Sequence, residues 1–121
     1  MDGMQDSSKV KVHSNAEELS VARSLRKSNV RKKITDYLFA ISPSSSYVSE
    51  IAYHIRSTPT NVIWAIRGMG SRYRDDGSLI SLNIVEQTSD GKDNNTKSYR
   101  LTDFGKEIIK SIRDNDDKNL F

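Results

Sequence analysis

The sequence contains no cysteine, which excludes disulfide bonds and thiolate metal sites. It also has no HExxH, CxxC or serine-elbow motif, and His13 and His54 are its only histidines. The longest apolar run, VIWAI, is too short to span a bilayer, and the first residues hold no apolar stretch of signal-peptide length. We therefore expect a soluble, cytoplasmic protein that is not an enzyme and binds no metal or cofactor. No sensor domain is visible, so no small-molecule effector is predicted.

Charge is unevenly distributed along a chain that is long enough for one domain. The 121 residues are 35% hydrophobic and 29% charged, which suits a single globular core. The net charge is +3, but residues 9–33 carry eight lysines or arginines against two glutamates, whereas residues 41–121 carry eleven charges of each sign. A basic arm attracts polyanions, although an ordinary solvated surface has the same composition.

The pattern divides the chain into three parts. Residues 1–27 form a basic extension with helix formers from about residue 16, residues 28–114 form the domain, and residues 115–121 form a polar tail. Leu19, Ala22 and Leu25, with Val21 beside them, give the extension a thin apolar edge. Because a short helix is marginal without packing, this segment either lies across a partner subunit or frays, and both interpretations remain open.

Two helices are predicted at the start of the domain. Residues 28–41 repeat apolar side chains at helical spacing and begin with a capping residue, Ser28 or Asn29. Residues 48–55 make a second, shorter apolar stripe, for which Ser49 is the predicted cap.

A third helix follows after the break RSTP. Pro59 suits its first position, and the pattern extends it over about 59–74. One face is apolar, with Val62, Ile66, Met69 and Tyr73, and the opposite face carries Thr60, Trp64, Arg67 and Ser71. Two helices joined by a tight turn indicate a helix-turn-helix, whose second helix lies in the major groove of DNA.

The rest of the domain is predicted to hold a β-hairpin and a last helix. NIVEQ and KSYRL have strand composition and flank a polar loop that contains an Asp-Gly turn signal. Thr102 is the expected cap of the last helix. The predicted fold class is α+β and mostly helical: three core helices, a two-stranded wing and a C-terminal helix.

Two segments resemble a known family. SLISLNIVEQ and YRLTDFGKEII are similar to the L-x-x-L-G-L-V and Y-x-L-T-x-x-G segments of prokaryotic winged-helix regulators of the ArsR and MarR types, archaeal ones above all. The resemblance covers about residues 28–113. Asn83 and Arg56 stand where many members of these families have glycine.

The resemblance implies a set of DNA-contacting residues. The second helix of the pair would offer base and phosphate contacts, the wing would reach the flanking backbone, and the first core helix would add phosphate contacts. In this sequence the corresponding residues are Thr60, Asn61, Trp64 and Arg67 on the helix, Lys92 and Lys97 in the wing, and Lys32 and Lys33 on the first core helix.

Two functions are consistent with these features. The first is a DNA-binding transcriptional regulator, expected to be a homodimer on double-stranded DNA because paired half-sites multiply the affinity of a weak module. The alternative is a winged-helix protein–protein interaction module within a larger assembly. In that case Trp64 would face another protein rather than DNA.

Overall fold

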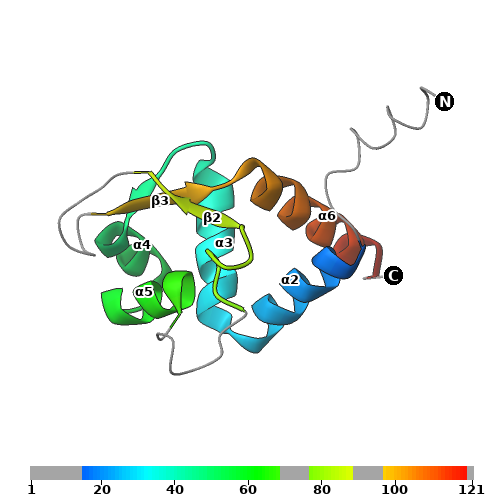
Figure 1. Ribbon diagram of the computed structural model, residues 1–121, viewed down its shortest axis with the longest axis horizontal. Helices are drawn as coiled ribbons and strands as arrows, with labels where there is room; N and C mark the ends of the chain where they lie inside the picture. Colours follow the sequence, from blue (N-terminus) through cyan, green and yellow to red (C-terminus); the bar gives the residue numbers. More distant parts are fainter. Residues whose placement is uncertain (1–14, 69–76, 89–96, 120–121) are drawn as a thin grey trace.

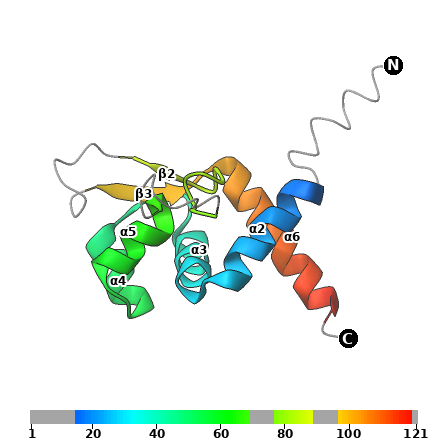
Figure 2. The same cartoon turned by 60° about the horizontal axis from the view of Figure 1, so that its bottom comes forward.

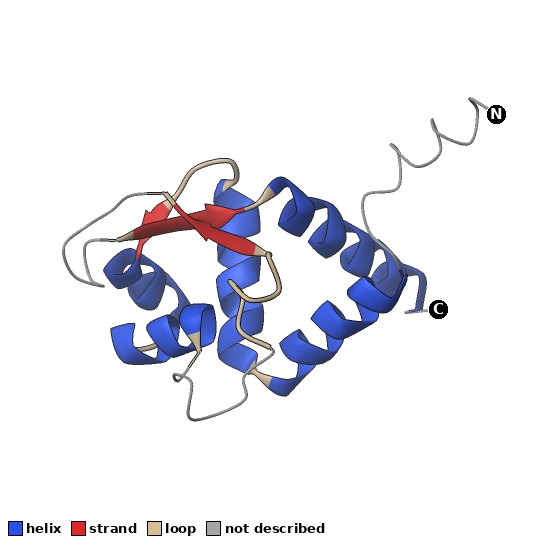
Figure 3. Ribbon diagram, viewed as in Figure 1, coloured by secondary structure: helices blue, strands red, loops and turns tan. Residues whose placement is uncertain are grey.

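The computed structural model describes residues 15–68, 77–88 and 97–119, which together form an α+β fold in which helices predominate (Figures 1 and 3). In the described residues the elements follow the order of a winged helix-turn-helix: four helices, the last two of which form the helix-turn-helix, then two strands that form the wing, and a final helix, with one short strand before the third helix. Their bounds are α2 Asn15–Lys27, α3 Asn29–Ile41, β1 Ser46–Tyr47, α4 Val48–Ile55, α5 Pro59–Arg67, β2 Val85–Gln87, β3 Ser98–Leu101 and α6 Asp103–Asn119. The predicted fold class is confirmed.

Helix α3 is the centre of the molecule, with α4 and α5 on one side and α2 and α6 on the other (Figures 1 and 2). It begins after Ser28, whose hydroxyl accepts the N–H of Arg31 at 3.2 Å, as the sequence predicts. Ile34 and Leu38 from its apolar stripe are fully buried. The central position follows from this stripe, because α3 contacts helices on both of its sides.

Helices α4 and α5 form the predicted helix-turn-helix. Ala52 and Val62 are both buried where the two helices pack. Arg56 closes α4 in the left-handed conformation, with φ of 59°, so arginine adopts the geometry for which glycine is the usual choice. The start of α4 differs from the prediction: its cap is Tyr47 rather than Ser49, and the Glu50 carboxylate accepts the Tyr47 N–H at 2.9 Å.

Helix α5 is shorter than predicted. It begins at Pro59 and ends at Arg67, whereas the sequence pattern extended it to about residue 74. Gly68 leaves the helix with φ of 87° and donates its N–H to the Trp64 carbonyl at 2.8 Å, which ends the helix with a conformation that glycine tolerates. Met69 and Tyr73, which were predicted to continue the apolar face, lie outside the described residues.

The described strands form one antiparallel sheet with the order β1-β3-β2. Strand β2 pairs with β3 through Val85 opposite Leu101, and β1 pairs with the other edge of β3. Beyond the β2 end, the Thr88 N–H donates to the Ser98 carbonyl at 2.8 Å. The sheet therefore supports the base of the wing, while residues 89–96 at the wing tip lie outside the described residues.

Residues 77–84 form a turn that leads into β2 and is hydrogen-bonded to α5. The Leu79 and Ile80 N–H groups donate to the carbonyls of Ala65 and Ile66 at 3.1 and 2.9 Å. Leu79 is fully buried, and Asn83 adopts φ of 61° at the end of the turn. The turn thus holds the C-terminal end of α5 to the core.

Helix α2 packs against α3 and α6 of its own chain (Figure 2). Val21 and Leu25 are buried there, and the Glu18 carboxylate accepts the Ser111 hydroxyl at 2.8 Å. Leu19, which belongs to the expected apolar edge, is 59% exposed in the single chain, whereas Val21 lies on the side of α2 that faces the core.

Candidate nucleic-acid interface

The outer face of α5 carries the four residues that the resemblance implies for DNA contact. Thr60, Asn61 and Arg67 are exposed, and Trp64 is 46% exposed. The opposite face of the same helix is buried through Val62, Ala65 and Ile66. The apolar face therefore fixes the helix, and the polar and aromatic face is open to solvent.

The start of α5 is held by two local hydrogen bonds. Thr58 caps the helix by accepting the Asn61 N–H at 3.1 Å, and the Asn61 amide group donates to the Ser57 hydroxyl at 3.4 Å. Pro59 occupies the first turn, where it costs no backbone hydrogen bond. The Asn61 side chain consequently lies over the turn between α4 and α5, near the end of the helix that would approach DNA first.

The other end of α5 is linked to the wing. Arg67 donates from Nη1 to the Gln87 Oε1 atom at 3.3 Å, which joins the last residue of α5 to the last residue of β2. Gln87 was not predicted as a site residue. The alternation along the strand is the signal that points to it, because Gln87 lies on the same face of β2 as the buried Val85 and so points toward the helices.

The base of the wing presents a charged pair on its other face. Arg100 donates to the Glu86 carboxylate at 2.8 Å, and both side chains are about half exposed. Lys97 is half-buried at the start of this hairpin arm, whereas Lys92 lies outside the described residues.

The structure places Lys32 away from α5. Its ammonium pairs with the Asp36 carboxylate at 3.1 Å, and its side chain lines a groove between α2 and α6. These two helices lie across α3 from α5 (Figure 1). Lys33 is exposed on α3 next to it. Lys32 therefore does not lie near the outer face of α5.

The described residues hold no group of three or more His, Cys, Asp or Glu side chains that is suited to bind a metal ion. His54 stacks on Tyr37 with ring centroids 4.8 Å apart, which gives it a packing role. None of the helices in the described ranges has the length and apolar character needed to cross a bilayer.

Comparison with known proteins assigns the chain to a family. Residues 21–112 match the EarA-like family. The chain is 43% identical over 96 residues to Uncharacterized protein MJ0905 from Methanocaldococcus jannaschii, an alignment that covers 79% of this chain and 84% of that protein. A crystal structure of the adhesin competence repressor AdcR from Streptococcus pyogenes aligns with a TM-score of 0.49 and 18% identity, over 84% of this chain and just under two thirds, 66%, of that chain. The family match over most of its length shows that this chain belongs to the EarA-like family.

Proposed function

We propose that this protein is a DNA-binding transcriptional regulator of the archaeal, ArsR/MarR-like winged-helix type, acting in the cytoplasm and without enzymatic activity. The observation that carries the proposal is the difference in burial between the two faces of α5. Its apolar face is fully covered, while Thr60, Asn61, Trp64 and Arg67 remain accessible along the other side. A helix held in this way after a tight turn is the element that helix-turn-helix proteins insert into the major groove.

The chemistry of this face suits base recognition. Asn61 matches the paired donor and acceptor of adenine, and the Arg67 guanidinium matches the two acceptors of guanine. Thr60, Trp64 and Arg67 are spaced i, i+4 and i+7, so they form one stripe along the helix. At a rise of about 1.5 Å per residue this stripe is roughly 10 Å long, a length that fits within a major groove about 12 Å wide.

The wing and the first core helix supply the remaining predicted contacts. Lys92 and Lys97 belong to the predicted wing, where a cation would meet the flanking backbone. Lys32 and Lys33 would contact phosphates only if the DNA extends beyond the site on α5 or bends. Such contacts would position the protein without reading sequence.

A homodimer is part of the proposal, and the groove between α2 and α6 supports it. Leu19 is exposed there beside Ala22 and Ile112. Helix α2 has Glu17 and Glu18 in its first turn and Arg26 and Lys27 in its last turn. If two copies of α2 pair antiparallel, each acidic end meets the basic end of the other copy, which makes the surface complementary to itself.

The second candidate function is a protein-binding winged-helix module. Trp64 is 46% exposed, and tryptophan is enriched at the centres of protein interfaces. The absence of net charge over residues 41–121 is also consistent with a protein partner.

A gel-shift assay with mixed genomic DNA at increasing salt concentration separates the two functions. We expect binding at low salt that weakens steeply, because a protein that makes about six phosphate contacts loses about a thousandfold in affinity between roughly 50 and 200 mM salt. Absence of a shift at low salt would contradict the regulator and favour the protein-binding module.

A further inference from the structure

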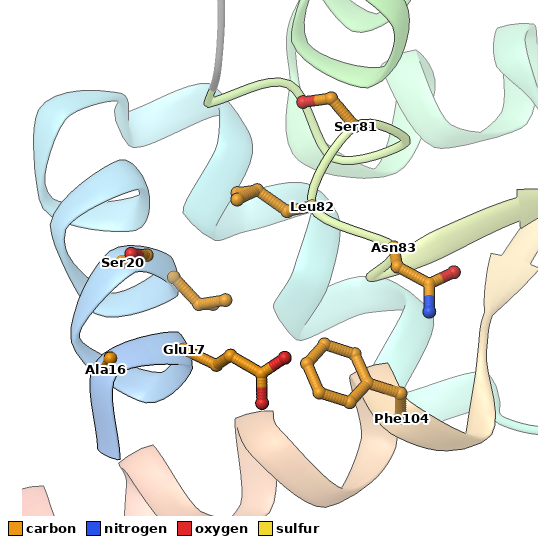
Figure 4. A pocket seen from close by; sticks show the side chains of 8 residues that line it. Ala16, Glu17, Ser20, Ser81, Leu82, Asn83 and Phe104 are labelled. Carbon is orange, nitrogen blue, oxygen red and sulfur yellow. The ribbon is translucent and has the colours of Figure 1, made fainter. Parts of the chain in front are cut away.

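A cavity lies between α2, the turn that precedes β2, and the first turn of α6, on the far side of this turn from α5 (Figure 4). Its volume is about 460 Å³, within the range of small-molecule sites. The residues that define it are Glu17, Ser20 and Val21 from α2, Leu82 and Asn83 from the turn, and Phe104 from α6. We propose that this cavity binds a small organic cation with an apolar body and that its occupancy alters the position of α5.

The lining determines the class of ligand. Among the lining residues that the structure describes, Glu17 is the one with a charged side chain, and Figure 4 shows its carboxylate beside the ring of Phe104. A carboxylate next to an aromatic face attracts an ammonium or guanidinium group through both its charge and the ring quadrupole. Val21 and Leu82 offer apolar contact for the body of the ligand. An anion of the same size would face the Glu17 charge and is disfavoured.

One wall of the cavity is preorganised. The Thr102 hydroxyl donates to the Asn83 carbonyl at 2.6 Å and accepts the Gly105 N–H at 2.8 Å, so the same side chain caps α6 and holds the end of the turn. A fixed wall reduces the ordering cost that a ligand must overcome. The cavity is thus formed before a ligand binds, with the Asn83 amide at its edge (Figure 4).

The other side of the turn reaches α5 directly. Leu79 and Ile80 donate their N–H groups to carbonyls in the last turn and a half of α5 at 3.1 and 2.9 Å. The start of the turn is tied to α2, because the Ser24 hydroxyl donates to the Gly77 carbonyl at 2.7 Å. A ligand that contacts both α2 and Leu82 therefore acts on a segment hydrogen-bonded to the proposed recognition helix. This regulatory part rests on the proposed DNA-binding function, whereas the binding site itself does not.

Binding is tested on the full chain without DNA. Phenethylammonium is the cationic probe, and benzoate is the anionic probe of similar size, with affinities measured by ¹H–¹⁵N NMR titration. We expect phenethylammonium to shift the signals of Leu82, Asn83 and Phe104 and Glu17→Gln to weaken it at least fivefold. Glu18→Gln is the matched control: it removes the neighbouring carboxylate, which faces Ser111 instead of the cavity, and should leave the affinity within twofold.

Three results would overturn the site: no shifts at the lining residues with the cation, equal binding of benzoate, or unchanged affinity in Glu17→Gln. Ser20→Trp provides a second test, because Ser20 is exposed at the cavity rim and a bulky side chain there should block the probe without entering the core. Unimpaired binding to a folded Ser20→Trp variant would also contradict the assignment.

The coupling is tested separately by fluorescence anisotropy on labelled DNA. We expect saturating phenethylammonium to change the DNA affinity of the natural protein at least threefold and that of Glu17→Gln by less. Cation binding with unchanged DNA affinity would overturn the coupling and leave the site. Cation binding in a protein that binds no DNA would instead overturn the proposed function.

Discussion

Arg56 and Asn83 carry the backbone through two turns in the left-handed conformation, with φ of 59° and 61°. Arg56 closes α4 and sets the angle at which α5 follows, and Asn83 leads from the turn into β2. Asparagine tolerates this conformation better than arginine, because its short polar side chain bonds locally. Arg56 is consequently the residue at which the helix-turn-helix is most strained.

The strain at Arg56 leads to a stability prediction. Replacing Arg56 with glycine should raise the free energy of unfolding by about 0.5–1 kcal/mol. Glycine adopts this conformation without the steric cost of about 1–2 kcal/mol that other residues have, and the entropy that glycine adds to the unfolded chain offsets part of this gain. Urea denaturation measures the change. Arg56→Ala is the control and should not stabilise the protein, because alanine keeps the Cβ atom. Equal stabilisation by both variants would show that the charge of Arg56, rather than its backbone, is the cause.

Gln87 illustrates how a residue outside α5 bears on recognition. Its side-chain oxygen accepts a hydrogen bond from Arg67 at 3.3 Å and limits the positions of the guanidinium. We predict that Gln87→Ala leaves the affinity for mixed DNA nearly unchanged but lowers the discrimination between preferred and random sequences severalfold. Selection from a random DNA library, followed by anisotropy measurements on the selected and scrambled sites, checks this. Unchanged discrimination would mean that the bond has no positioning role.

At the scale of the elements, caps and close contacts determine where the helices lie. Thr58 caps α5 and Thr102 caps α6, and both hydroxyls accept a backbone N–H three residues later. Gly105 lies in the first turn of α6 against the backbone of Ile84, so closely that an added Cβ atom would overlap the Ile84 carbonyl. This contact lets α6 approach the turn before β2.

Gly105 gives a prediction at this scale. Gly105→Ala should lower the free energy of unfolding by about 1–3 kcal/mol, because the new methyl group meets backbone that cannot move aside easily. Gly77→Ala is the matched comparison: its Cβ atom would meet the end of the Arg31 side chain at 2.6 Å, and a flexible side chain can rotate away. Thermal and urea denaturation of both variants should show the larger loss for position 105. A larger loss at position 77 would contradict this account.

The element predictions from the sequence succeeded mainly where apolar residues repeat at a regular spacing. The stripes of α3 and α4, the Thr102 cap and both wing strands are confirmed, whereas the Ser49 cap predicted for α4 is not. The end of α5 was wrong because Met69 and Tyr73 continue the apolar spacing, whereas Gly68 leaves the helix through its own backbone conformation. The sequence does not tell which side of the short helix α2 faces the core: Val21 is buried and Leu19 is exposed, and whether Leu19 contacts a partner subunit stays a prediction. The Arg67–Gln87 contact joins residues far apart in the chain: the alternation along the strand indicates the face on which Gln87 lies, but it does not identify Arg67 as its partner.

At the scale of the whole molecule, α3 separates two surfaces with different properties. The outer face of α5 and the wing lie on one side, and the groove between α2 and α6 lies on the other (Figure 1). The basic excess of residues 9–33 accordingly falls partly on the side away from α5: Arg26 and Lys32 line this groove. A dimer formed through this groove would leave the proposed recognition helix of each copy free to reach DNA.

The dimer prediction belongs to this scale. Leu19→Asp should raise the dimer dissociation constant at least tenfold, because it places a charge in the exposed apolar centre of the groove between α2 and α6. Sedimentation equilibrium measures the change. Tyr53→Asp introduces the same charge at an 80% exposed position on α4 and should leave association unaffected. Equal association of Leu19→Asp and the natural protein would place the dimer contact elsewhere.

The most direct test of the central claim is the DNA affinity of Arg67→Ala across a series of salt concentrations. Lys110→Ala, which removes one positive charge from an exposed position on α6, is the matched control. If α5 lies in the major groove, Arg67→Ala should weaken binding by about 1–3 kcal/mol at a selected site, or should lower the salt slope by about one if Arg67 binds a phosphate. Lys110→Ala should change neither quantity appreciably. Identical affinity and salt slope for Arg67→Ala and the natural protein would contradict the assignment of α5 as the recognition helix.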